Sequence, residues 1–137
     1  MNLFSYLKKF MSVLLVIALL ASLATTAAAS VFEDVPDNAY FSMPVSWAYE
    51  NGITSGTSAT SFSPSATCTR SQVVTFLWRA FGSPEPSTST NPFSDISKSD
   101  YFYKAVLWAY ENNITKGTSA NNFSPLVSCT RGEVVTL

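Results

Sequence analysis

Apolar residues recur along this chain with the period of amphipathic helices. Around residue 105, apolar side chains fall at positions i, i+3, i+4 and i+7, and the same spacing recurs around residue 45. This spacing gathers apolar side chains on one face of an α-helix. Together with the start and stop signals along the chain, the pattern predicts helices at residues 40–51, 70–81, 101–112 and 131–137.

Two of the predicted helices begin with a capping box. Thr69 is followed three positions later by Gln72, and Thr130 is followed by Glu133. In this motif the hydroxyl accepts a backbone N–H of the first helical turn, and the Gln or Glu side chain accepts the N–H of the Thr. The helix at residues 70–81 is apolar on two sides, so it needs neighbours on both sides.

The chain contains a tandem duplication. Residues 32–76 and 93–137 align at a constant offset of 61 positions without a gap, and 25 of the 45 aligned residues are identical. Each copy has a helix, a Gly/Ser/Thr/Asn-rich loop around Phe-Ser-Pro, for which we expect at most a short β-bridge, and a second helix. One copy is too small to cover its two-sided second helix, so we expect the copies to share a core.

The duplication sets the expected organisation of the chain. We assign repeat 1 to residues 30–83 and repeat 2 to residues 92–137, joined at residues 84–91 by a Ser/Thr/Pro linker with no apolar period to pack. Repeat 2 stops inside the segment equivalent to residues 73–81, so we interpret the chain as truncated. The fold class expected from this pattern is mainly α, with two tandem helix–loop–helix repeats.

Residues 1–29 have the layout of a secretory signal peptide. Lys8 and Lys9 precede an apolar stretch that ends at Ala24, and an Ala-x-Ala cleavage signal lies at residues 27–29. The alternative is a transmembrane anchor, but the apolar stretch falls short of the roughly 20 residues that a spanning helix needs. We therefore predict cleavage after Ala29 and an exported chain that has no membrane contact afterwards.

Composition narrows the possible functions. Among 137 residues, 12% are charged, the net charge is −1 and there is no histidine. A protein without a strongly positive surface potential binds nucleic acid poorly. The absence of histidine excludes His-based catalysis and His metal sites. We predict no catalytic residue, no metal site and no cofactor.

A set of spaced motifs, present twice, resembles the S-layer homology (SLH) family. In the first copy the motifs are Phe32-Glu-Asp34-Val35, Tyr40-Phe41, Trp47-Ala48, Asn51-Gly52-Ile53, Gly56, Phe62-Ser63-Pro64 and Thr69-Arg70. The resemblance implies a pseudo-threefold helical bundle built from three repeats, with the second helices at its centre. It also implies binding of secondary cell-wall polysaccharide, which often carries pyruvate ketals, and anchoring to the peptidoglycan sacculus. The family's Thr-Arg motif supplies an Arg that contacts the anionic polymer.

The first candidate binding residues are two arginines. Arg70 and Arg131 each follow a predicted N-cap, where a cation is mildly unfavourable because the helix N-terminus is itself positive. A bound carboxylate or ketal would give both the guanidinium and the free N–H groups a partner. The alternative is an ion pair with Asp34 or Asp95.

Two tryptophans and two glycines complete the set of candidate polysaccharide-binding residues. Trp47 and Trp108 lie off the apolar face of their helices, where an indole would suit stacking on a sugar ring, and plain core packing is the alternative. Gly56 and Gly117 permit a positive φ or a close backbone approach to a ligand, and a simple turn is the alternative.

Four further residues are interpreted as structural. Asp34 and Asp95 lie a few positions before a helix, where acidic residues brace the chain, and no second carboxylate recurs at glycosidase spacing. Thr69 and Thr130 are the predicted helix caps.

The two cysteines occupy equivalent positions in the two copies. We interpret Cys68 and Cys129 as small buried hydrophobic residues, where the resembling family carries Ile or Val. A disulfide needs Cα atoms within about 7 Å, and repeat-equivalent positions around a pseudo-threefold axis seldom come that close unless they line the axis itself. Two thiols without other soft ligands do not predict a metal site.

The leading functional hypothesis is a non-catalytic module that anchors an exported protein to the cell wall or surface layer through polysaccharide. One alternative is the anchor portion of an exported enzyme whose catalytic domain lies beyond residue 137. The other is a self-assembling surface-layer protein. Because the last helix is cut short, we also expect the chain to self-associate or to be only marginally stable.

Overall fold

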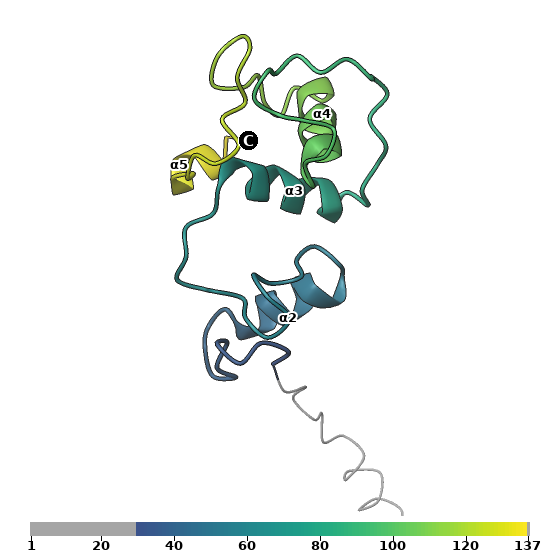
Figure 1. The fold of residues 1–137 in the computed structure, drawn as a ribbon. Coiled ribbons are helices and arrows are strands. Elements are labelled where there is room, and N and C mark those ends of the chain that lie inside the picture. Colours follow the sequence, from purple (N-terminus) through teal and green to yellow (C-terminus); the bar gives the residue numbers. More distant parts are fainter. Residues whose placement is uncertain (1–29, 137) are drawn as a thin grey trace, which may run out of the picture.

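The computed structural model describes residues 30–136, so the predicted signal peptide and its cleavage site lie outside the described residues. The described part is mainly helical, as the sequence predicts, and it contains no β-strand beyond one isolated bridge. Its helices are α2 (Ser42–Glu50), α3 (Arg70–Ala80), α4 (Tyr103–Glu111) and α5 (Arg131–Val134) (Figure 1). None of the helices within residues 30–136 has the length and apolarity to cross a bilayer.

Helices α3 and α5 begin at the two predicted capping boxes. Thr69 Oγ1 accepts the N–H of Gln72, and Gln72 Oε1 accepts the N–H of Thr69 at 2.9 Å. Thr130 and Glu133 form the same pair of bonds at the start of α5. Helix α5 is shorter than expected, with four residues in place of the predicted 131–137.

An aspartate braces the loop of each repeat. The carboxylate of Asp34 accepts the backbone N–H groups of Phe62 and Ser63 at 2.8 and 2.7 Å. Asp95 accepts those of Phe123 and Ser124 at 2.9 and 2.7 Å. These bonds lower the pKa of Asp34, with the bond from Phe62 as the main cause. Each aspartate thereby ties the start of its repeat to the Phe-Ser-Pro turn.

The main core is built by both repeats. Helix α3 of repeat 1 packs against α4 of repeat 2, whereas α2 lies apart from both with its own loop (Figure 1). Val74 of α3 belongs to the same buried cluster as the apolar residues around α4, and Leu77 and Trp78 pack against that cluster. A smaller cluster of Phe32, Val35 and Val45 forms under α2. The copies therefore share a core as expected, and within residues 30–136 repeat 1 contributes to it mainly through α3.

The predicted linker is held by polar contacts. Trp78 Nε1 donates to the carbonyl of Pro84 at 2.8 Å, and the Glu111 carboxylate accepts the N–H groups of Ser87 and Thr88. Glu85 pairs with Lys104 on α4. The sequence of this segment did not predict these bonds. They join the linker to side chains that lie outside it, such as those of Glu111 and Lys104.

The structure contradicts the prediction that both cysteines are buried. Cys68 is exposed and Cys129 is half-buried. The N–H of Cys129 donates to the carbonyl of Cys68 at 2.9 Å, so these repeat-equivalent positions are neighbours. The prediction that these positions lie apart was wrong. The N-terminus of α3 lies next to residues 127–129, the segment of repeat 2 that precedes α5.

Candidate functional site

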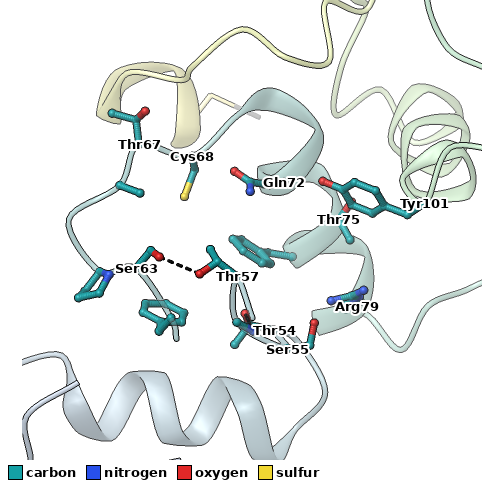
Figure 2. A pocket seen from close by; sticks show the side chains of 15 residues that line it. Thr54, Ser55, Thr57, Ser63, Thr67, Cys68, Gln72, Thr75, Arg79 and Tyr101 are labelled. Carbon is teal, nitrogen blue, oxygen red and sulfur yellow. Dashed lines mark hydrogen bonds between the residues drawn. The ribbon is translucent and has the colours of Figure 1, made fainter. Parts of the chain in front are cut away.

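A cleft of about 540 Å³ lies between the loop of repeat 1 and α3 (Figure 2). The loop supplies most of one wall, α3 supplies another, and Tyr101 reaches the cleft from repeat 2. The lining residues are Thr54, Ser55, Gly56, Thr57, Phe62, Ser63, Pro64, Ala66, Thr67, Cys68, Gln72, Thr75, Phe76, Arg79 and Tyr101.

The polar side of α3 faces this cleft. Gln72, Thr75 and Arg79 are spaced i, i+3 and i+7, so they share one face of the helix. Arg79 Nη1 donates to the carbonyl of Ile53 at 3.2 Å, which is the one side-chain hydrogen bond of this guanidinium within residues 30–136. A guanidinium has five N–H donors. The remaining donors of Arg79 are therefore available to an anion.

Hydroxyl groups and aromatic rings make up much of the remaining lining. Thr57 and Ser63 bond to each other through their hydroxyls at 2.7 Å (Figure 2). Tyr101 is 63% exposed. Of the described residues that line the cleft, Arg79 alone carries a formal charge. Hydroxyl donors and acceptors, an aromatic ring and one cation together suit a sugar that carries an acidic group.

Arg70 connects the two repeats. Its side chain is 8% exposed, Nε donates to the carbonyl of Phe123 at 2.9 Å, and Nη2 donates to Thr115 Oγ1 at 3.4 Å. The guanidinium also lies over the Phe123 ring, 5.0 Å from its centroid. Among residues 30–136 Arg70 makes no ion pair, so the alternative pairing with Asp34 or Asp95 is absent. Arg131, its equivalent in repeat 2, is exposed.

The two candidate tryptophans differ in their surroundings. Trp108 is 7% exposed and packs with its ring centroid 5.5 Å from that of Phe81, so the core-packing alternative describes this residue. Trp47 is 59% exposed on α2, which leaves its ring open to a ligand. Neither indole lines the cleft beside α3.

The two candidate glycines form matching tight turns. Gly56 has φ +78° and Gly117 has φ +81°. A Cβ on Gly56 would lie 2.5 Å from the Phe32 ring and from the Ser61 carbonyl oxygen, and Gly117 meets the same kind of crowding. Glycine is needed here by its positive φ and by close packing within the protein. Gly56 also lines the cleft.

Comparison with known proteins identifies the family. The model of the S-layer homology domain matches residues 31–74 and 92–135. The chain belongs to the S-layer homology family.

Relatives of this SLH chain are much longer proteins. The chain is 33% identical over 96% of its length to an endoglucanase of Bacillus sp. (strain KSM-635), of which the match covers 15%. It is 35% identical over 73% of its length to the surface-layer 125 kDa protein of Lysinibacillus sphaericus, of which 9% is covered. It is 27% identical over 87% of its length to a cell surface protein of Thermoanaerobacter kivui, of which 16% is covered. The family and these relatives identify an exported, cell-surface-attached protein.

Of the six candidate polysaccharide-binding residues from the sequence, the cleft contains Gly56 alone. Sequence reasoning missed Gln72, Arg79 and Tyr101. One signal was present: Gln72, Thr75 and Arg79 form a polar stripe between the two apolar sides of α3. No such signal marks Tyr101, because its place at the cleft depends on how repeat 2 packs against α3.

Proposed function

We propose that this SLH chain is a non-catalytic module that anchors an exported protein to the cell wall by binding anionic secondary cell-wall polysaccharide, with pyruvate ketals as the acidic groups. The observation that carries the proposal is the cleft beside α3, where Arg79 is the formal charge amid hydroxyl groups and aromatic rings. Charge-assisted, bidentate bonds from a guanidinium match a carboxylate.

The proposal gives Arg79 the main electrostatic role. Arg131 and Trp47 are exposed and are proposed as further contacts along the polymer. Arg70 and Trp108 are engaged inside the protein, so a direct contact of either with polymer stays a prediction. Their packing supports the site indirectly, because Arg70 and Trp108 join α3 to repeat 2. The turn at Gly56 shapes the loop wall of the cleft.

Calorimetric titration of the chain with extracted wall polysaccharide tests this function. The titration is done before and after chemical removal of the acidic substituents from the polymer. Charged hydrogen bonds contribute about 1.5–3 kcal/mol each, so Arg79→Ala should weaken binding roughly ten- to a hundredfold. Arg79→Lys should restore part of the affinity, because lysine keeps the charge but lacks the planar fork.

Lys98→Ala provides the matched control. Lys98 is an exposed cation of repeat 2 that does not line the cleft, so its loss changes the net charge by the same amount as Arg79→Ala. If both variants bind the polymer equally well, the cleft is not the binding site. If removal of the acidic groups leaves affinity unchanged, the ligand is not recognised as an anion. Circular dichroism of each variant shows whether the helices are retained.

A second candidate function comes from the relatives. One relative is an endoglucanase and two are surface proteins. The chain could therefore serve as the anchor portion of an exported enzyme or as part of a self-assembling surface layer. DNA sequence beyond codon 137 would show whether a catalytic domain follows. Sedimentation of the full product without polymer would show whether it assembles unaided.

Self-association of this chain is a related proposal. Trp47 and Phe81 are large apolar residues that are 59% and 71% exposed, and burial of such surfaces between copies would be favourable. We expect the thermal transition to shift upward with protein concentration. A sharp transition that is independent of concentration, from a species that sediments as a monomer, would contradict this expectation.

A further inference from the structure

The only β-type pairing within residues 30–136 places the backbones of the two cysteines next to each other. Thr69 and Ser128 form an isolated antiparallel bridge. The N–H of Arg70 donates to the carbonyl of Val127, and the N–H of Cys129 donates to the carbonyl of Cys68, both at 2.9 Å. In an antiparallel pair, one step back on one segment matches one step forward on the other. Cys68 is therefore directly opposite Cys129.

Directly opposed residues have side chains on the same face of the pairing. Because the Cys129 N–H donates to the Cys68 carbonyl, the pair occupies a hydrogen-bonded position. Cα atoms at such a position are expected about 5.5 Å apart, which is inside the range of about 4.4–6.8 Å found in disulfides. Their Cβ atoms, about 5.5 Å apart at such a position, need to approach by about 1 Å to enter the range of about 3.5–4.5 Å found in disulfides. Because the bridge is isolated, no continuing ladder on either side opposes this approach.

The two thiols differ in accessibility. Cys68 is exposed at the edge of the cleft (Figure 2), whereas Cys129 is half-buried. Burial raises the pKa of the Cys129 thiol, the positive charge of Arg70 acts in the opposite direction, and negative charge on Glu133 or Cys68 raises it further. An oxidant in solution thus meets Cys68 first, and Cys129 is placed to react second.

We propose that Cys68 and Cys129 form a disulfide that joins repeat 1 to repeat 2 once the exported chain meets a low-molecular-weight disulfide. The Cys68 thiolate attacks the small disulfide, forms a mixed disulfide and releases one small thiolate. The Cys129 thiolate then attacks the Cys68 sulfur and releases the second. Two protein thiols are oxidised, one small disulfide is reduced to two thiols, and the two protons pass to the released thiolates.

The location of the chain and of the cysteines indicates that this bond would persist and would stabilise the fold. Disulfides persist outside the cell, where exported proteins reside. Each cysteine directly precedes the cap residue of a second helix, Thr69 of α3 or Thr130 of α5. The bond would hold these two helix starts together and would close a loop that contains α3, the linker and α4. Closing a long loop stabilises a protein chiefly by restricting its unfolded chain. This inference does not depend on the proposed ligand.

Redox equilibration of the full chain tests the proposal. The reduced chain is incubated at low concentration with equal amounts of reduced and oxidised glutathione, quenched with acid and analysed by mass spectrometry, intact and as peptides. We expect a monomer that has lost two hydrogens and a peptide pair joining Cys68 to Cys129. The melting temperature should rise by about 10 °C or more on oxidation and should return to its original value with dithiothreitol.

The double variant Ser128→Cys/Cys129→Ser is the matched control. It keeps two thiols but moves one of them by one residue, to the opposite face of the bridge. It should accumulate glutathione adducts without an internal bond, and Cys68→Ser and Cys129→Ser should show no rise in melting temperature. Because closure needs the Cys129 thiolate, whose formation burial disfavours, closure should become faster as the pH rises above neutral.

Three results would overturn the proposal. In the first, the unaltered chain retains free thiols or stable glutathione adducts at equilibrium. In the second, it forms disulfide-linked dimers in place of an internal bond. In the third, the shifted double variant closes as readily as the unaltered chain, which would mean that the opposed geometry is irrelevant. Circular dichroism under reducing conditions confirms that each serine variant is folded, since serine is close in size to cysteine.

Discussion

Repeat 1 and repeat 2 share most of their sequence but not their surroundings. Trp47 and Trp108 are equivalent positions on α2 and α4, yet 59% of the first and 7% of the second is exposed. The difference arises because α3 and the residue after it, Phe81, cover α4, and no described segment covers α2 in the same way. In this chain the burial of a first helix is set by the second helix of the preceding repeat.

The two arginines follow the same rule. Arg70 reaches the Phe123 carbonyl and Thr115 of the next repeat, whereas Arg131 is exposed and forms no side-chain hydrogen bond of this kind within residues 30–136. Identical Cys-Thr-Arg segments thus hold one buried and one exposed guanidinium. The comparison separates what a repeat does by itself from what it does for its neighbour.

The largest expected difference concerns the tryptophans. Trp108→Ala should lower the free energy of unfolding by about 3–5 kcal/mol, because it leaves a cavity in the main core. Trp47→Ala should change it by no more than about 0.5 kcal/mol, as is usual for an exposed site. Urea unfolding followed by circular dichroism measures both. Equal losses would mean that repeat 1 has a covering neighbour as repeat 2 does.

The arginines should differ somewhat less. Arg70→Ala removes two side-chain hydrogen bonds between the repeats and should cost about 1.5–3 kcal/mol of stability, whereas Arg131→Ala should be nearly neutral. The same two proteins are titrated with wall polysaccharide. A folded Arg70→Ala protein whose stability is unchanged but whose affinity has fallen would reassign Arg70 from joining the repeats to contacting the polymer.

The two capping threonines should show a smaller contrast. Thr69→Ala should destabilise the chain by about 1 kcal/mol, because Thr69 caps the eleven-residue helix α3, which packs in the main core. Thr130→Ala should cost less than about 0.5 kcal/mol, since α5 has four residues and none of them is buried. Thermal unfolding of the two variants and of Thr69→Ser, which keeps the hydroxyl, measures the difference. A larger loss from Thr130→Ala would place α5 in a core.

The smallest expected effect is on pH dependence. The pKa of Asp34 in the folded protein lies below its ordinary 3.8, because its carboxylate accepts the N–H of Phe62 and of Ser63. The stabilisation from this carboxylate is therefore complete above that ordinary value and is lost as the pH falls through the lower folded pKa. Circular dichroism of the helices should report this loss at acid pH.

Two variants separate the carboxylates of the two repeats in that experiment. Asp34→Asn should flatten the acid part of the stability curve. The bonds from Thr130 likewise lower the pKa of Glu133 in repeat 2, so Glu133→Gln should remove a further part of the dependence with the same sign. An acid transition that Asp34→Asn leaves unchanged would show that the bonds to the Phe-Ser-Pro turn do not hold repeat 1.

Local features of the fold were predictable from the chain. The helices start and end within a few residues of the predicted positions, because capping boxes and helix-ending Asn and Gly act over one turn. The site was harder to predict. Arg79 could have been found from the polar stripe on α3. The place of Tyr101 at the cleft, and the pairing of Cys68 with Cys129, depend on contacts between segments far apart in the sequence.

The sequence by itself determined the mainly helical fold, the two repeats and the family, because periodic apolar positions, caps and spaced motifs are local and occur twice. Only the tertiary structure decided which of two identical residues is buried. Helix α3 crosses from its own repeat to cover α4, and this single packing choice buries Trp108 and Arg70, leaves Trp47 and Arg131 open, and sets Cys68 against Cys129. The burial of a residue in one repeat depends on which segment of another repeat packs against it, and no local pattern within a repeat predicts that segment.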